Sequence, residues 1–237
     1  MNSRFPGQVA LITGDCDDLS LTLARALLQE DAQVALACQG DLGGGAIEAT
    51  GARWYAMDLR NGKASQAVLR SVADQLGRID IWLHYASATA CASGTAGLDG
   101  VHNCARFIGE TMQSQENGRV IFVASVAGLF APAGQALRNS QEAALFMLTK
   151  SLAVDWAPLG LRVNAIALGV VQNGVAAPDD HLLGRIPMGR AARPQELVEA
   201  ALFLADDRES SFITGEVLRL DGGWTAYHLF HPFDEAF

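Results

Sequence analysis

Three polar residues in the middle of the chain have types and spacing that could carry chemistry: Ser125, Arg138 and Glu142. Arg138 and Glu142 are four residues apart in a segment with helical spacing of apolar residues, so they can form an ion pair on one helix face. A guanidinium keeps its proton near neutral pH, so Arg138 cannot serve as a proton donor. The Ser125 hydroxyl is then expected to be satisfied by nearby backbone groups.

His84 and Tyr85 form a second candidate pair, because they end an apolar run, IDIWLHY, that is typical of a buried strand. Ligands of α/β proteins bind at the carboxyl ends of strands, where a histidine could act as a base and a tyrosine as an acid. A packing role for His84 is the alternative. A hydrolase built from Ser125 and His84 is not favoured, because no glycine elbow surrounds the serine.

The segments that must position these residues alternate between apolar runs and amphipathic stretches. This order predicts a doubly wound parallel sheet covered by helices on both faces, that is, a single α/β domain over residues 1–237. The expected strands are 8–13, 33–38, 53–57, 79–85, 119–124, 162–167 and 216–220, and the main helices are 19–30, 63–76, 98–115, 135–156 and 194–205.

Composition excludes several classes of function. The 237 residues carry a formal net charge of -9, which disfavours binding to nucleic acid. No apolar run approaches the roughly 18 residues of a membrane span, and the first residues do not resemble a signal peptide, so we expect a cytoplasmic protein away from membranes. The four cysteines show no metal-binding spacing, and we expect no metal site.

Four stretches together resemble the short-chain dehydrogenase/reductase family over almost the whole chain. They are VALITG, GRVIFVASVAG, AALFMLTKSLAVDWAPLGLRVNAIALG and a final block that runs from IPMGR to DGGWTA and is similar to bacterial β-ketoacyl reductases. The resemblance implies a Rossmann-type fold and a nicotinamide dinucleotide, NAD or NADP. Because one fold hosts many functions, each functional position has to be compared separately.

The cofactor turn departs from the family pattern TGxxxGxG. Thr13 and Gly14 match, whereas Asp18 and Ser20 replace the later glycines, and Asp15 and Asp17 add charge. We expect Asp17 or Asp18 to occupy the place of the cofactor phosphate, since a carboxylate suits a helix N-terminus. Two alternatives are ordinary solvated caps with the cofactor in a shifted pose, and a divalent metal that bridges the aspartates and a phosphate.

Other family positions are mixed. The resemblance implies vestigial cofactor contacts at Asp58, Leu59 and Gly169, but Gln39 encodes no clear choice between NAD and NADP. The family's NNAG motif reads His84, Tyr85, Ala86 and Ser87, and a later threonine position reads Asn173.

Of the four catalytic positions that the resemblance implies, only the serine is kept, at Ser125. Gly97 stands at the asparagine position, Arg138 at the proton-donating tyrosine and Glu142 at the lysine. Glu142 cannot replace the lysine, since it repels the phosphates of a cofactor.

These departures predict a non-catalytic subunit that needs no cofactor and pairs with an active paralogue, as in heteromeric members of the family. The first alternative is an NAD- or NADP-dependent oxidoreductase with a remodelled site at His84, Tyr85 and Ser125. The second is a sensor that binds a small molecule without turnover. A homo- or hetero-oligomer, dimer or tetramer, is expected, with the aromatic tail 225–237 at an interface through Phe230, Phe233 and Phe237.

Overall fold

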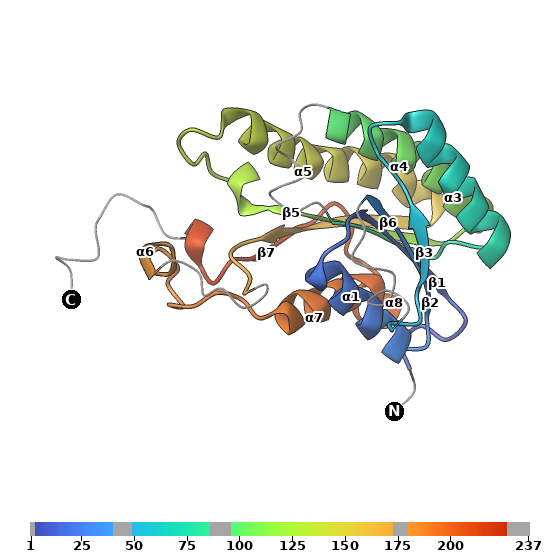
Figure 1. The fold of residues 1–237 in the computed structure, drawn as a ribbon, viewed down its shortest axis with the longest axis horizontal. Coiled ribbons are helices and arrows are strands. Elements are labelled where there is room, and N and C mark those ends of the chain that lie inside the picture. Colours follow the sequence, from blue (N-terminus) through green and yellow to red (C-terminus); the bar gives the residue numbers. More distant parts are fainter. Residues whose placement is uncertain (1–2, 40–48, 86–95, 173–179, 227–237) are drawn as a thin grey trace.

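A single parallel sheet of seven strands organises the computed structural model, which describes residues 3–39, 49–85, 96–172 and 180–226 (Figure 1). The strand order is β3-β2-β1-β4-β5-β6-β7, and every neighbouring pair is parallel. The predicted doubly wound fold is therefore confirmed. The strands are β1 (Val9–Asp15), β2 (Gln33–Gln39), β3 (Arg53–Ala56), β4 (Ile81–Tyr85), β5 (Gly118–Ser125), β6 (Leu161–Leu168) and β7 (Val217–Leu220).

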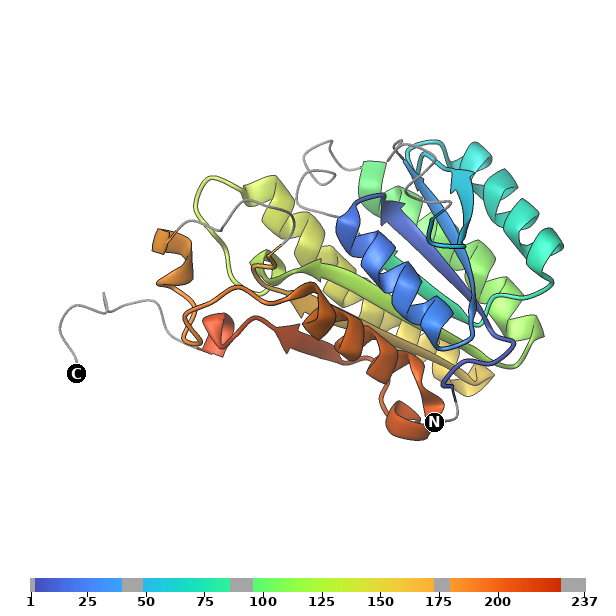
Figure 2. The same ribbon diagram turned by 60° about the horizontal axis from the view of Figure 1, so that its bottom comes forward.

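Helices cover both faces of the sheet. Figures 1 and 2 show α3, α4 and α5 on one face and α1, α7 and α8 on the other. Their bounds are α1 (Asp18–Gln29), α3 (Gly62–Leu76), α4 (Ala96–Ser114), α5 (Ala136–Trp156), α7 (Pro194–Ala205) and α8 (Asp207–Ser210), with the short α6 (Asp180–Leu183) and 3-10 turns η2 (Val126–Gly128), η3 (Ala157–Leu159) and η4 (Trp224–Ala226).

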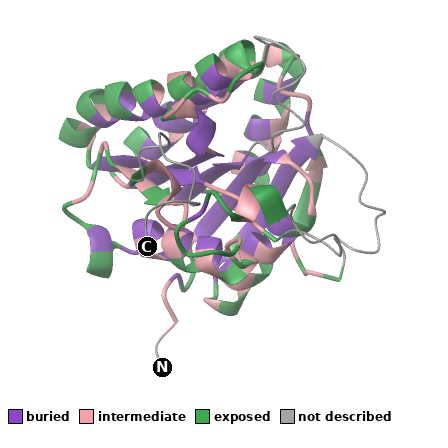
Figure 3. Ribbon diagram, turned by 90° about the vertical axis from the view of Figure 1, so that its left-hand side faces the viewer, coloured by how far each residue is buried: buried purple, intermediate pink, exposed green. Residues whose placement is uncertain are grey.

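Each face of the sheet has its own apolar core, because the central strands are buried along their whole length. Every residue of β4 and β6 is buried, as the continuous apolar runs predicted. One core packs α1 and α7 on the sheet, and the other packs α3, α4 and α5. Figure 3 shows the buried strands between helices whose outer sides are exposed.

The strand order reverses between β1 and β4, and this point places the candidate site. The chain leaves β1 toward β2 on one side, while β4 lies on the other side of β1. In open parallel sheets, ligands bind beyond the carboxyl ends of the strands at such a reversal. The residues that end these strands, Asp15, Tyr85 and Ser125, are among those selected from the sequence.

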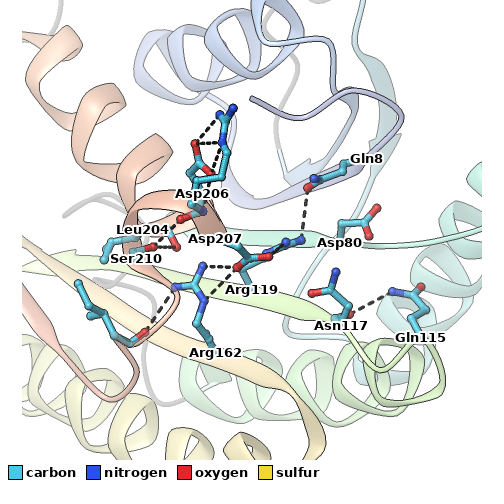
Figure 4. A network of polar contacts seen from close by, with 12 residues as sticks. Gln8, Asp80, Gln115, Asn117, Arg119, Arg162, Leu204, Asp206, Asp207 and Ser210 are labelled. Carbon is cyan, nitrogen blue, oxygen red and sulfur yellow. Dashed lines mark hydrogen bonds and ion pairs between the residues drawn. The ribbon is translucent and has the colours of Figure 1, made fainter. Parts of the chain in front are cut away.

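At the amino-terminal ends of the strands, opposite the candidate site, lies a network of charged side chains (Figure 4). Arg119 and Arg162, near the starts of β5 and β6, are only 4% and 8% exposed. Asp207, the first residue of α8, accepts hydrogen bonds from Arg119 Nε at 3.0 Å and from Arg162 Nη2 at 2.9 Å. One carboxylate thus compensates two buried guanidinium groups.

Among the helices of the described ranges, none has both the length and the apolar character needed to cross a bilayer. In the same part of the chain, no three His, Cys, Asp or Glu side chains are grouped so as to hold a metal ion.

Candidate functional site

Gly14 shapes the turn between β1 and α1. Its φ is +117°, and a Cβ added there would lie 1.7 Å from the carbonyl oxygen of Tyr85. A larger residue would therefore push β1 and β4 apart at the switch point. Gly14 keeps the sheet closed where the chain turns toward α1.

Asp17 caps the N-terminus of α1. Its Oδ1 accepts hydrogen bonds from the amides of Leu19 and Ser20, both at 3.0 Å. In return, the Ser20 hydroxyl accepts from the Asp17 amide at 2.9 Å, which completes a capping box. Asp18 is exposed. Of the two aspartates expected to take the place of a phosphate, Asp17 is the one whose carboxylate lies on the helix amides.

Tyr85 holds the other oxygen of this carboxylate. Its hydroxyl donates to Asp17 Oδ2 at 3.1 Å, and the residue is 7% exposed. Burial, followed by the negative charge of Asp17, raises the pKa of Tyr85 well above its usual value. Tyr85 therefore keeps its proton and acts as a hydrogen-bond donor to Asp17.

As the side chains stand, the turn does not fit the diphosphate of a dinucleotide. The amides of Leu19 and Ser20, which a phosphate would use at the start of α1, are already bound to Asp17. Two further carboxylates, Asp15 and Asp18, lie in the same turn. Because like charges repel by about 1 kcal/mol at 4 Å even in water, a diphosphate requires the Asp17 side chain to move away.

His84 lies inside the protein, away from this turn. It is 1% exposed and lies beside the rings of Trp82 and Phe122, and its Nδ1 is 3.0 Å from the Thr13 hydroxyl oxygen. The Thr13 hydroxyl oxygen also accepts a hydrogen bond from Trp82 Nε1 at 2.9 Å. The Thr13 hydroxyl can therefore donate its own proton to Nδ1 of a neutral His84 ring. Burial lowers the pKa of His84 to about 4, which makes it a packing residue and not a base exposed to substrate.

The buried His84 should make the protein less stable in mild acid. Since the folded state favours the neutral ring, this stability is complete above pH 6.5 and is lost as the pH falls toward 4. We expect the free energy of unfolding to fall by about 2 kcal/mol between pH 7 and pH 5 from this group alone. Denaturant titrations of His84→Gln should lack this part of the pH dependence. His102→Gln, at an exposed position of α4, is the control and should retain it; equal curves for the two variants would contradict the assignment.

Glu142 lies beside Ser125, and these two residues together with Arg138 form a polar corner. Glu142 is 1% exposed, and its Oε2 accepts the backbone amide of Ser125 at 2.7 Å. The Ser125 hydroxyl oxygen accepts from the Ala127 amide at 3.2 Å and caps η2. The hydroxyl proton of Ser125 is not used in any contact seen within the described ranges, so it can be donated to a substrate oxygen.

Arg138 completes this corner. Its Nε is 3.7 Å from Glu142 Oε1, which confirms the predicted ion pair, and its Nη1 donates to Gln135 Oε1 at 2.9 Å. Within the described part of the chain, the buried Arg138 Nε has no hydrogen-bond partner, and neither does Asn139 Oδ1. The corner therefore presents a cation, a hydroxyl proton and a buried carboxylate together.

The remaining predicted cofactor residues have structural partners. Thr13 is buried against Trp82 and His84. Arg60 holds Asp58 through two side-chain hydrogen bonds of 2.9 Å, and these bonds lower the Asp58 pKa. The Leu59 carbonyl packs against Gly100.

Five further predictions concern the ends of the chain and of its elements. Gly169 follows β6 and donates its amide to the Leu220 carbonyl, and a Cβ there would lie 2.9 Å from the Asp221 Cα. Gly97 lies at the start of α4. Ser87, Asn173 and the tail beyond residue 226 lie outside the described residues.

Two contacts were missed by sequence reasoning. The hydrogen bond from Tyr85 to Asp17 joins residues 68 positions apart, and the bond from the Ser125 amide to Glu142 joins β5 to α5. The structure does not bring His84, Tyr85 and Ser125 together as one remodelled site, because each contacts a different element. The signal that could have found these contacts is that each includes a position where the chain departs from the family pattern, Tyr85 in one and Glu142 in the other.

Comparison with known proteins places this geometry in a family. A sequence profile described as enoyl-(acyl carrier protein) reductase matches residues 19–225. The chain is 30% identical to the 3-oxoacyl-(acyl-carrier-protein) reductase of Thermotoga maritima, covering 93% of this chain and 98% of the relative. It is 29% identical to the cis-4-hydroxycyclohexanecarboxylate dehydrogenase of Sinomonas cyclohexanicum, with 95% and 100% covered. A solved NAD+-bound xylitol dehydrogenase superposes with a TM-score of 0.82 at 26% identity, over 93% of this chain and all of that one.

These findings correct two expectations. The prediction of a non-catalytic subunit is contradicted, because the relatives that match nearly the whole chain are dehydrogenases and reductases. The prediction that no cofactor is needed is contradicted as well, because a relative of the same fold is solved with NAD+ bound. These expectations gave too much weight to the altered positions at 17, 138 and 142, and too little to the family resemblance of the rest of the chain. With its profile match, its full-length relatives and its sheet topology, the chain belongs to the short-chain dehydrogenase/reductase family.

Proposed function

We propose that the protein is an oxidoreductase that interconverts an alcohol and a carbonyl compound with a nicotinamide dinucleotide, using Ser125, Arg138 and Glu142 in its catalytic corner. Its relatives over nearly the full chain support the reaction class. The observation that carries the choice of residues is the buried Glu142 carboxylate beside Ser125 and Arg138. The cofactor would supply or accept a hydride when bound.

The chain's own residues would bind and polarise the substrate. The hydroxyl of Ser125 and the guanidinium of Arg138 can both donate hydrogen bonds to a carbonyl oxygen, and the cation stabilises negative charge that develops there. Arg138 does not release its proton, so the proton of the product hydroxyl has to come from another group. Glu142 contacts the Ser125 amide and pairs with Arg138, and we assign it the role of general acid and base.

A direct assay tests this proposal. The purified chain is incubated with NAD or NADP and secondary alcohols, including cyclic hydroxy acids, and with NADH or NADPH and 3-oxoacyl thioesters, while nicotinamide absorbance is followed. We expect turnover with at least one pair and a large loss in Ser125→Ala. Absence of hydride transfer with every pair, in a sample whose melting curve shows it to be folded, would contradict the proposal.

We further propose that the chain self-associates through the outer face of α5. Met147 and Val154 are 62% and 75% exposed, although they lie seven residues, about two turns, apart on one stripe. The opposite face of α5 buries Leu145, Phe146 and Leu152, so this helix carries large apolar side chains on both faces. An exposed apolar stripe on a helix of this kind is typical of an interface.

Charged residues on this stripe should dissociate the assembly. We expect Met147→Lys combined with Val154→Lys to reduce the mass measured by light scattering from that of an oligomer to that of a monomer. Gln66→Lys combined with Asp74→Lys, at exposed positions of α3, is the control and should leave the mass unchanged. An unaltered oligomer in the α5 variant would exclude this face.

A further inference from the structure

One contact at the cofactor turn involves a residue that departs from the family pattern. Asp17 lies in the segment that has lost its later glycines, and Tyr85 stands where the family has an asparagine. The two side chains are joined by a 3.1 Å hydrogen bond across the switch point of the sheet. The Leu19 and Ser20 amides hold one carboxylate oxygen of Asp17 on the helix, and the Tyr85 hydroxyl holds the other.

The Asp17 carboxylate makes the contacts that a phosphate group makes at a helix N-terminus. One oxygen accepts hydrogen bonds from the backbone amides of Leu19 and Ser20, and the other accepts a hydrogen bond from the Tyr85 hydroxyl. Its negative charge also complements the helix dipole. A dinucleotide that binds here in the usual way competes with Asp17 for the same donors.

We propose that Asp17, held by Tyr85, is an internal occupant of the diphosphate site and sets the affinity of this chain for nicotinamide dinucleotides. This inference rests on the proposed function, and it identifies Asp17 and Tyr85 as the residues that control cofactor binding. Dinucleotide binding requires the carboxylate to leave the α1 amides, so the unaltered chain binds these cofactors weakly. Ligands without a diphosphate do not meet this competition.

Replacements at Asp17 distinguish two effects of its carboxylate on cofactor binding: its occupation of the α1 amides and its negative charge. Asp17→Gly removes the carboxylate and leaves the amides open, and glycine is well tolerated at a helix N-cap. Asp17→Asn removes the charge but keeps an oxygen that can cap the helix, so it should have a smaller effect. Tyr85→Phe removes only the bond to Oδ2 and should free Asp17 in part. Asp18→Asn, an exposed neighbour, is the matched control for charge alone.

The probes are NADH, ADP-ribose and adenosine, titrated by calorimetry into each variant. We expect Asp17→Gly to bind NADH and ADP-ribose about 10- to 100-fold more tightly than the unaltered chain, as for a ligand that regains two charge-assisted hydrogen bonds. Adenosine affinity should change less than about twofold, because adenosine has no phosphate. Melting curves of each variant establish that it is folded, and Asp17→Asn and Tyr85→Phe keep the test usable if Asp17→Gly is unstable.

The outcomes separate this inference from the proposed function. Equal NADH affinity in Asp17→Gly and Asp18→Asn, or micromolar NADH binding by the unaltered chain that Asp17→Gly does not improve, would overturn the role of Asp17 even if hydride transfer occurs. A gain in affinity without hydride transfer in any variant would support the role of Asp17 and contradict the proposed function. Absence of dinucleotide binding in every variant would contradict both.

Discussion

Replacing Glu142 with glutamine should lower kcat about 100- to 10,000-fold, which is the usual contribution of a general acid or base. A glutamine has almost the same shape and can still accept the Ser125 amide through its carbonyl oxygen, so the fold should be preserved. The loss should therefore appear in kcat, while the melting temperature changes little. Steady-state kinetics across pH 5 to pH 9 are the measurement, because removing the general acid or base should also flatten the pH profile.

The control for this prediction is Asp155→Asn, an exposed acid near the C-terminal end of the same helix. It changes the net charge by the same amount and should leave kcat within about twofold, since distant surface changes have small effects. If Glu142→Gln retains full activity and an unchanged pH profile, Glu142 only supports the backbone of Ser125. The proton would then have to be exchanged with solvent or another residue.

Replacing Asp207 with alanine should destabilise the fold by about 3–4 kcal/mol, because it leaves two buried guanidinium groups without their shared carboxylate. Burial already lowers the pKa of Arg119, and burial together with the nearby Arg119 lowers the pKa of Arg162 to about 10. Asp207 is itself 43% exposed, so the effect should lie toward the lower end of the range for fully buried pairs. Thermal unfolding should show a decrease in Tm of about 6–16 °C for a chain of this length.

Two variants test the cause of this loss. Asp74→Asn, at an exposed position of α3, should change stability by less than about 0.5 kcal/mol. Arg162→Leu in the Asp207→Ala background should recover part of the loss, since it removes one uncompensated charge. A double variant less stable than Asp207→Ala would show that Arg162 stabilises the fold mainly through its bond to the Ile213 carbonyl and through packing.

The fold could be predicted almost completely from the sequence because local patterns determine it. The apolar runs that became β4 and β6 are continuous, and the proline that opens α7 stands at Pro194, as expected for a first helical turn. The pairing of Arg138 with Glu142 also followed from spacing along one helix. Such inferences need only neighbours in the sequence.

The site could be predicted only in part because its contacts join distant segments. The Asp17 cap follows from the sequence, but its bond to Tyr85 depends on how β1 and β4 pair in the sheet. Burial decided the role of His84, since the same residue at an exposed strand end would have been a plausible base. The functional prediction was wrong for a related reason: substitutions at known catalytic positions indicate that the usual machinery is changed, and they do not by themselves indicate that turnover is lost.

The capping box at α1 also bears on how this protein can evolve. Aspartate and glycine codons differ by a single base, so one point mutation at codon 17 exchanges the carboxylate for hydrogen. Glycine at an N-cap costs only a few tenths of a kcal/mol relative to aspartate, so the N-cap of α1 tolerates this exchange. If Asp17 sets cofactor affinity as proposed, a lineage that carries this turn is one nucleotide away from a different affinity.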